Sequence, residues 1–136
     1  MNRHAENMPD TERLEVVLAG VTIDCLDPEA SAAFWSALLE RPALTVGPDR
    51  AGWYRLGPVV KGGPVINFQP VAELNVGKVR VHLDLWADDL DAVARRVETL
   101  GGSRSGEREV VAGRGTIAVM NDPEGNEFCI ISADRS

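Results

Sequence analysis

The stretch "VRVHLDLWADDLDAVARRVETLGG", residues 79–102, decides the fold because a strand pattern passes directly into a helix pattern. Residues 79–87 alternate apolar and polar side chains, which is typical of a strand with two different faces. Asp88 and Asp89 then offer side chains that cap a helix. The apolar residues of that helix recur at helical spacing: Leu90, Val93, Ala94, Val97 and Leu100. Gly101 and Gly102 end it.

Three further strands are expected after this helix, at about 107–112, 115–121 and 126–132. The sequence "NDPEG" at 121–125 predicts the turn between the last two. In this turn, Asp122 and Gly125 are expected to serve the turn geometry.

The same order of elements occurs once before in the chain. Residues 14–26 are rich in β-branched side chains and predict a strand, after which Asp27 and Pro28 open a helix. Its apolar positions are Ala30, Phe34, Ala37 and Leu38, and Pro42 ends it. Short strands are expected around 43–47, 52–57 and 64–69. The chain therefore repeats the order β-α-β-β-β at an offset of roughly 60 residues.

This repeat predicts an α+β fold with one domain over residues 14–133. Its two modules are residues 14–72 and 79–133, and residues 1–13 are expected to be a flexible leader.

The composition limits the partners of the protein. A net charge of −7 and a pI of about 4.8 argue against nucleic acid, which requires a basic face. The basic residues are scattered and no apolar run reaches the length of a membrane span, so we expect no membrane partner and a cytoplasmic location. The two cysteines, Cys25 and Cys129, form no disulfide framework and no CxxC zinc pattern.

His82 is one of only two histidines and falls inside the predicted strand 79–87. It either ligates a metal, lines a pocket or is an ordinary strand residue. Alternation divides the strand into two faces. One face, expected to lie against the helix layer, comprises Val81, Leu83 and Leu85; the other comprises His82, Asp84 and Trp86.

Four stretches in this order resemble the vicinal-oxygen-chelate superfamily of glyoxalases, bleomycin-resistance proteins and dioxygenases, and in particular small bacterial glyoxalase-like proteins. They are "VTIDCLDPEASAAFWSALL" (21–39), "INFQPV" (66–71), residues 79–102 and "MNDPEGNEFCII" (120–131). The resemblance implies two tandem βαβββ modules that form a cupped mixed sheet with helices on its outer face. It also implies a homodimer, which would cover sheet edges.

The resemblance further implies a divalent metal on the concave face, held by His, Glu or Gln at four strand positions. These positions fall on Gly20, Asn67, His82 and Cys129 of this chain. Only His82 is a strong match, so we expect no bound metal and no other cofactor. Asp84 and Glu127 share the face with His82, which leaves an unusual site open.

The residues expected to bind a small molecule in the cup are aromatic or polar: His82, Asp84, Trp86, Trp53, Asn67, Gln69, Glu127 and Cys129. Glu127 and Cys129 alternate with Phe128 and Ile130, which should face the helices. Trp53 is preferred to Tyr54 as the larger stacking surface. Asp24 is expected at the rim of the cup.

Each candidate also has a structural interpretation. Polar residues that alternate along a strand usually form a solvated sheet face, and the two amides can simply satisfy neighbouring strands. Cys129 can be an inert thiol, and Cys25 is expected in the core. Trp35 is expected at the margin between helix and sheet.

Three hypotheses of function remain open. The first is a binding protein that holds a small molecule in the cup, preferentially a cation because the cup is acidic. The second is a lyase, isomerase or dioxygenase, either with an unusual metal site or with acid–base chemistry by His82 together with Asp84 or Glu127. The third is an accessory module that acts through dimerisation alone.

Overall fold

The computed structural model describes residues 14–57, 63–73, 77, 79–106, 109–111 and 115–132. The predicted leader at 1–13 lies outside the described residues. The first module contains β1 (Gly20–Cys25), α2 (Pro28–Leu39), β2 (Ala43–Thr45), a short 3₁₀ helix η2 (Pro48–Arg50), β3 (Tyr54–Leu56) and β4 (Val65–Pro70). The second contains β5 (Asp84–Trp86), α3 (Leu90–Thr99), β6 (Ser103–Arg104), β7 (Glu109–Val111), β8 (Gly115–Asn121) and β9 (Glu127–Ser132).

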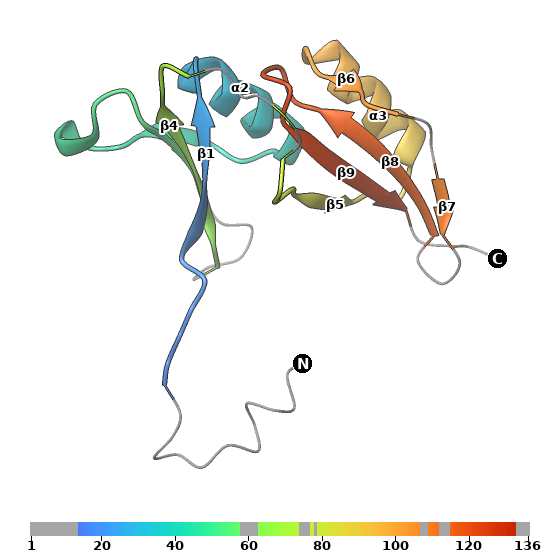
Figure 1. Cartoon of the computed structure of the whole chain (residues 1–136), viewed down its shortest axis with the longest axis horizontal. Helices are drawn as coiled ribbons and strands as arrows, with labels where there is room; N and C mark the ends of the chain where they lie inside the picture. The colour runs from blue at the N-terminus through green and yellow to red at the C-terminus, as the bar shows by residue number, and fades with distance from the viewer. Residues whose placement is uncertain are drawn as a thin grey trace.

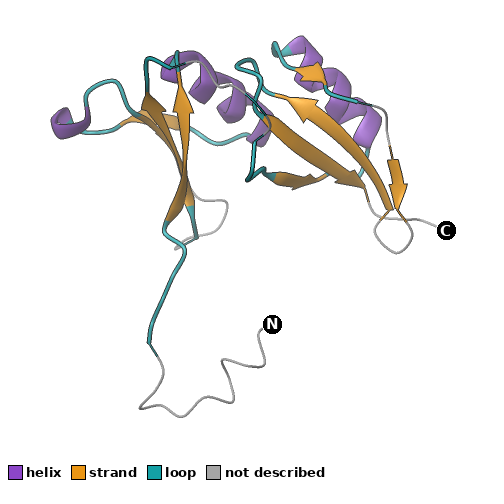
Figure 2. Ribbon diagram, viewed as in Figure 1, coloured by secondary structure: helices purple, strands orange, loops and turns teal. Residues whose placement is uncertain are grey.

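The two modules have the same sheet topology (Figures 1 and 2). The first sheet has the order β1-β4-β3-β2 and the second β5-β9-β8-β6, with β7 also paired to β8. In both modules the first strand is parallel to the last, and the remaining pairs are antiparallel. The predicted α+β fold of two βαβββ modules is confirmed, with β6 and β7 together in the place of one strand.

The predicted caps start both helices. The side chain of Asp27 accepts a hydrogen bond from the Ala30 N–H, and that of Asp89 accepts one from the Ala92 N–H, each at 3.1 Å. Helix α3 ends before Gly101, whose φ of 104° lies in the left-handed region that favours glycine. Short polar side chains at the N-cap thus set where each helix begins.

Helix α2 lies between the two sheets and joins their cores (Figure 1). Trp35 and Phe34 of this helix contact Phe128 of β9, with ring centroids 4.7 and 6.2 Å apart. Trp35 is 1% exposed, so the expectation that it lies at a helix margin is wrong. The aromatic cluster buries apolar surface from both modules in one core.

The first strand of each module is shorter than expected, and so are β2 and β3. Strand β1 begins at Gly20 rather than at residue 14, because β4 offers partners only from Val65 onward. Residues 14–19 continue away from the sheet, with exposed apolar side chains (Figure 1). Strand β5 begins at Asp84 rather than at residue 79, so His82 lies just before the strand and not in its middle.

The predicted division of residues 79–87 into a helix-facing side and a second side is only partly correct. Leu83 and Leu85 pack against the core, whereas Val81 is 79% exposed and does not join the helix layer. In α2, Ala30 is exposed, although it was expected on the apolar stripe. Strand β6 and the 3₁₀ helix were not predicted.

Among the described residues, no helix is long and apolar enough to cross a membrane.

Candidate functional site

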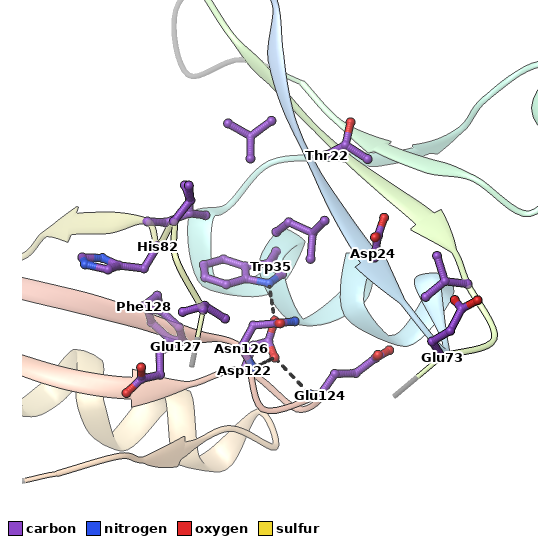
Figure 3. A pocket seen from close by; sticks show the side chains of 16 residues that line it. Thr22, Asp24, Trp35, Glu73, His82, Asp122, Glu124, Asn126, Glu127 and Phe128 are labelled. Carbon is purple, nitrogen blue, oxygen red and sulfur yellow. Dashed lines mark hydrogen bonds between the residues drawn. The ribbon is translucent and has the colours of Figure 1, made fainter. Parts of the chain in front are cut away.

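A cavity of about 460 Å³ lies between the two modules (Figure 3). Its walls come mainly from β1, from the residues that precede β5, from the turn between β8 and β9, and from the first residues of β9. Sixteen residues line it: Val21, Thr22, Ile23, Asp24, Trp35, Val71, Glu73, Val79, Val81, His82, Leu83, Asp122, Glu124, Asn126, Glu127 and Phe128. Cavities of a few hundred Å³ with apolar walls and a few polar groups are typical of small-molecule sites.

The floor of the cavity is a buried Trp–Asp pair. The Trp35 Nε1–H donates to Asp122 Oδ2 at 3.4 Å, and Asp122 is 3% exposed (Figure 3). Asp122 also accepts from the backbone N–H groups of Glu124 and Asn126 at 3.0 and 2.9 Å, which confirms its predicted turn role. The turn between β8 and β9 therefore holds the Trp35 indole in place.

Glu124 joins the same turn to the first module. Its carboxylate accepts hydrogen bonds from the N–H groups of Leu26 and Asp27 at 2.7 and 2.8 Å, and from the Ser31 hydroxyl at 3.1 Å. A carboxylate at this position also lies at the positive end of the α2 dipole. Glu124 thus fixes the start of α2, and with it Trp35, against module two.

The cavity is acidic. It is lined by five carboxylate residues, and among the described residues that line it none is Lys or Arg. Asp122 and Glu124 are occupied by the hydrogen bonds above. Glu127 accepts a hydrogen bond from the Ser105 hydroxyl at 2.9 Å, which leaves it further acceptor capacity. Asp24 and Glu73 are exposed and bring negative charge to the opposite wall.

His82 stands at the edge of this cavity, with its ring directed away from Trp35 (Figure 3). Its Nδ1 lies 3.2 Å from Asp84 Oδ1, and both side chains are nearly half exposed. Candidate ligand atoms of His82, Asp84 and Cys129 all lie within 4.8 Å of one another. The structure therefore brings three of the residues predicted from sequence together.

The predicted ligand-binding residues of module one, Asn67, Gln69 and Trp53, are not brought together with His82 in the cavity lining. Asn67 and Gln69 pair with Thr22 and Asp24 of β1, so these four share one face of the first sheet. Trp53 precedes β3 and has the Arg50 guanidinium 4.9 Å from its ring centroid. Tyr54 packs against the core instead. Asn67, Gln69 and Trp53 are not among the cavity-lining residues, whereas Asp24, which was expected at the rim, is one of them.

Trp86 also lies outside the cavity lining and is 75% exposed. Of the eight residues predicted from sequence, His82 and Glu127 line the cavity, and Asp84 and Cys129 adjoin His82. Trp35 and Glu124 were not identified from sequence as site residues. The sequence "DPEG" predicts a turn, and no neighbouring residue in the sequence indicates that the Glu124 side chain reaches α2.

The four-position metal set implied by the resemblance does not fit this chain. A Cβ at Gly20 would lie 2.8 Å from the Val65 carbonyl oxygen, so the backbone leaves no room there for a ligating side chain. Asn67 Oδ1 accepts a hydrogen bond from Arg55 Nε at 2.8 Å, which places a cationic guanidinium where a metal would have to approach. Only His82 and Cys129 remain of the four positions.

Cys25 is a core residue, as predicted. It is fully buried, and its thiol donates to the Ile23 carbonyl at 3.3 Å. Burial raises its pKa from 9.0 to about 11, and the neighbouring carboxylates add to this shift. A thiol in this state is not a nucleophile at neutral pH.

Solved structures share this architecture at low sequence identity. A glyoxalase/bleomycin resistance protein/dioxygenase family enzyme from Burkholderia phytofirmans PsJN has a TM-score of 0.70 and 18% identity, over 88% of this chain and 100% of that chain. A glyoxalase/bleomycin resistance protein from Albidiferax ferrireducens T118 has a TM-score of 0.63 and 18% identity, over 86% and 98%.

The fosfomycin resistance protein FosX from Listeria monocytogenes, in a mutant form complexed with Mn(II) and 1S,2S-dihydroxypropylphosphonic acid, has a TM-score of 0.70 and 16% identity, over 90% and 95%. No curated protein has a significant match to this chain.

The paired βαβββ modules of this chain and these neighbours share one fold. Residues 20–131 match the model of the glyoxalase-like domain, and the chain belongs to that family.

Proposed function

We propose that this protein binds a small, cationic, partly aromatic molecule in the cavity between its modules. The observation that carries the proposal is the lining, which combines an indole floor and aliphatic walls with five carboxylate residues and, among its described members, no Lys or Arg. Asp24, Glu73 and Glu127 would set the charge preference, and the aliphatic walls would contact the apolar part.

Matched indole compounds test this proposal. Tryptamine is a cation, 3-ethylindole is neutral and indole-3-propionate is an anion, while the ring is the same in all three. Titrations by calorimetry in the presence of EDTA should give the order of affinity tryptamine, then 3-ethylindole, then indole-3-propionate. Asp24→Asn and Glu127→Gln should each reduce the preference for tryptamine over 3-ethylindole by up to about fivefold, which corresponds to about 1 kcal/mol, the upper end for an exposed charge pair.

Glu98→Gln is the matched control, since Glu98 lies on α3, pairs with Arg104 and is not part of the cavity lining. It should leave the preference unchanged. Equal affinity for the cation and the anion would contradict the proposal, and so would a loss of preference in Glu98→Gln as large as that in Asp24→Asn.

A second candidate function is acid–base catalysis on a small oxygenated substrate, as a lyase or isomerase. The observation that favours it is the His82–Asp84 pair at the cavity edge, with Nδ1 and Oδ1 3.2 Å apart. A carboxylate beside an imidazole orients the ring for proton transfer. Exchange of solvent deuterium into candidate carbonyl substrates, lost in His82→Gln but retained in His82 wild type, would distinguish catalysis from binding alone.

We also propose that the protein is a homodimer and cytoplasmic. Strands β1 and β5 are sheet edges, and Trp86 of β5 is largely exposed, so a second copy would cover an apolar edge. Cys25 and Cys129 are thiols rather than a disulfide, which suits a reducing compartment. Sedimentation equilibrium at high micromolar concentration should give twice the chain mass, and a monomer under these conditions would contradict the dimer.

A further inference from the structure

We propose that module two alone carries a divalent-metal site formed by His82, Asp84 and Cys129, with a ligand set suited to Zn²⁺. This inference does not depend on the proposed function. It reverses the expectation from sequence that no metal binds, and it develops the unusual site that the shared face of His82 and Asp84 had left open.

The strand register brings the three side chains together. In the parallel pair of β5 and β9, Asp84 is the direct partner of Cys129, and the Cys129 N–H donates to the Leu83 carbonyl at 2.9 Å. His82 precedes Asp84 by two residues and approaches it at 3.2 Å. The backbone pairing therefore fixes the positions from which all three side chains extend.

The spacing is close to that of a zinc site. The three ligand atoms lie within 4.8 Å of one another. Tetrahedral Zn²⁺ with bonds of about 2.0–2.3 Å holds its ligand atoms about 3.3–3.6 Å apart. Closing the difference of about 1 Å requires only side-chain rotation, which the partly exposed His82 and Asp84 allow.

The chemistry of the donors selects the metal. A thiolate, an imidazole and a carboxylate form a mixed soft and hard set that suits Zn²⁺ or Co²⁺ better than Mg²⁺ or Ca²⁺. The thiolate and the carboxylate together carry two negative charges, which match a dication. Nothing in this set comes from Gly20 or Asn67, so the site differs from the four-position set shared between modules.

Cobalt provides the direct test, because a thiolate ligand gives a characteristic charge-transfer absorption and tetrahedral Co²⁺ gives intense visible bands. Tag-free, reduced and EDTA-treated full-length protein should bind Co²⁺ with these features at about one ion per chain, and Zn²⁺ should displace it. Cys129→Ser should remove the charge-transfer band. His82→Ala and Asp84→Asn should each weaken binding by at least the 10- to 100-fold that even outer-shell losses cost.

Cys25→Ala, His4→Ala and Asn67→Ala are the matched controls. They replace the other cysteine, the other histidine and the module-one amide, and they should leave stoichiometry and affinity unchanged. Circular dichroism of each variant establishes that it is folded. The inference is overturned if binding does not saturate near one equivalent, if Cys129→Ser keeps the charge-transfer band, or if Asn67→Ala weakens binding as much as Asp84→Asn.

Discussion

Replacing Glu124 with Ala removes the acceptor of three hydrogen bonds that join the turn of module two to the start of α2 in module one. The partners are the N–H groups of Leu26 and Asp27 and the hydroxyl of Ser31. Hydrogen bonds to a charged group contribute about 1.5–3 kcal/mol each when they are isolated from water. Leu26 and Asp27 are exposed, so water can replace the lost acceptor at both N–H groups.

We therefore expect a loss of about 2 kcal/mol in the free energy of unfolding, most of it from the buried Ser31 and from the helix dipole. For a chain of this size, 1 kcal/mol corresponds to about 3–5 °C in Tm, so Glu124→Ala should melt about 6–10 °C below the wild type. Glu124→Gln keeps one acceptor oxygen and should lose about half as much.

Thermal melts followed by circular dichroism measure this directly, with Glu98→Ala as the control. Glu98 pairs with Arg104 Nε at 3.3 Å, but the two side chains are 47% and 40% exposed. Such a surface pair is worth about 0.5 kcal/mol or less. If Glu124→Ala melts within 1 °C of Glu98→Ala, the contact between the turn and α2 does not hold the modules together, and the reasoning is refuted.

Three further predictions follow from burial. Trp86→Ala should change the free energy of unfolding by less than about 1 kcal/mol. Trp35→Ala should lower it by about 3–5 kcal/mol, because it opens the core and leaves Asp122 without its indole partner. Equal shifts in melting temperature for the two variants would contradict this contrast. The pKa of Cys25 is raised above its ordinary value. The buried neutral thiol therefore contributes to stability below pH 9.0, and this contribution is lost as the pH rises towards about 11. Between pH 9.0 and about 11, the free energy of unfolding of the wild type should therefore fall by on the order of 2 kcal/mol more than that of Cys25→Ala, as measured by urea unfolding. Parallel curves of unfolding free energy against pH would contradict the raised pKa of Cys25. At pH 8, a thiol reagent should label Cys129 rapidly and Cys25 only on unfolding, and two fast thiols would show that Cys25 is accessible.

The fold could be predicted from sequence because its signals are local. Asp27 and Asp89 cap their helices through side chains three residues from the N–H groups they bind, and alternation predicts which residues of β9 face the helices. Strand ends were less predictable, because they depend on partners. Residues 14–19 are as rich in apolar side chains as β1, but β4 has no residues to pair with them.

The residues that line the cavity could be predicted only where the lining depends on position along one strand. His82 and Glu127 were identified because they alternate with apolar residues in the sequence, and both line the cavity. Trp35 and Glu124 were missed as site residues because their roles depend on contacts across 87 and more than 90 positions of sequence. The link between Asp84 and Cys129 was missed for the same reason, since it arises from the register of β5 on β9.

The indole N–H signals of the three tryptophans provide the most direct test of the cavity as the ligand site. In ¹H–¹⁵N spectra, tryptamine should shift the Nε1–H signal of Trp35, which donates to Asp122 on the cavity floor. The signals of Trp53 and Trp86 should stay in place, because neither residue lines the cavity. A shift of Trp86 or Trp53 with Trp35 unchanged would place the ligand on the open sheet faces and contradict the account.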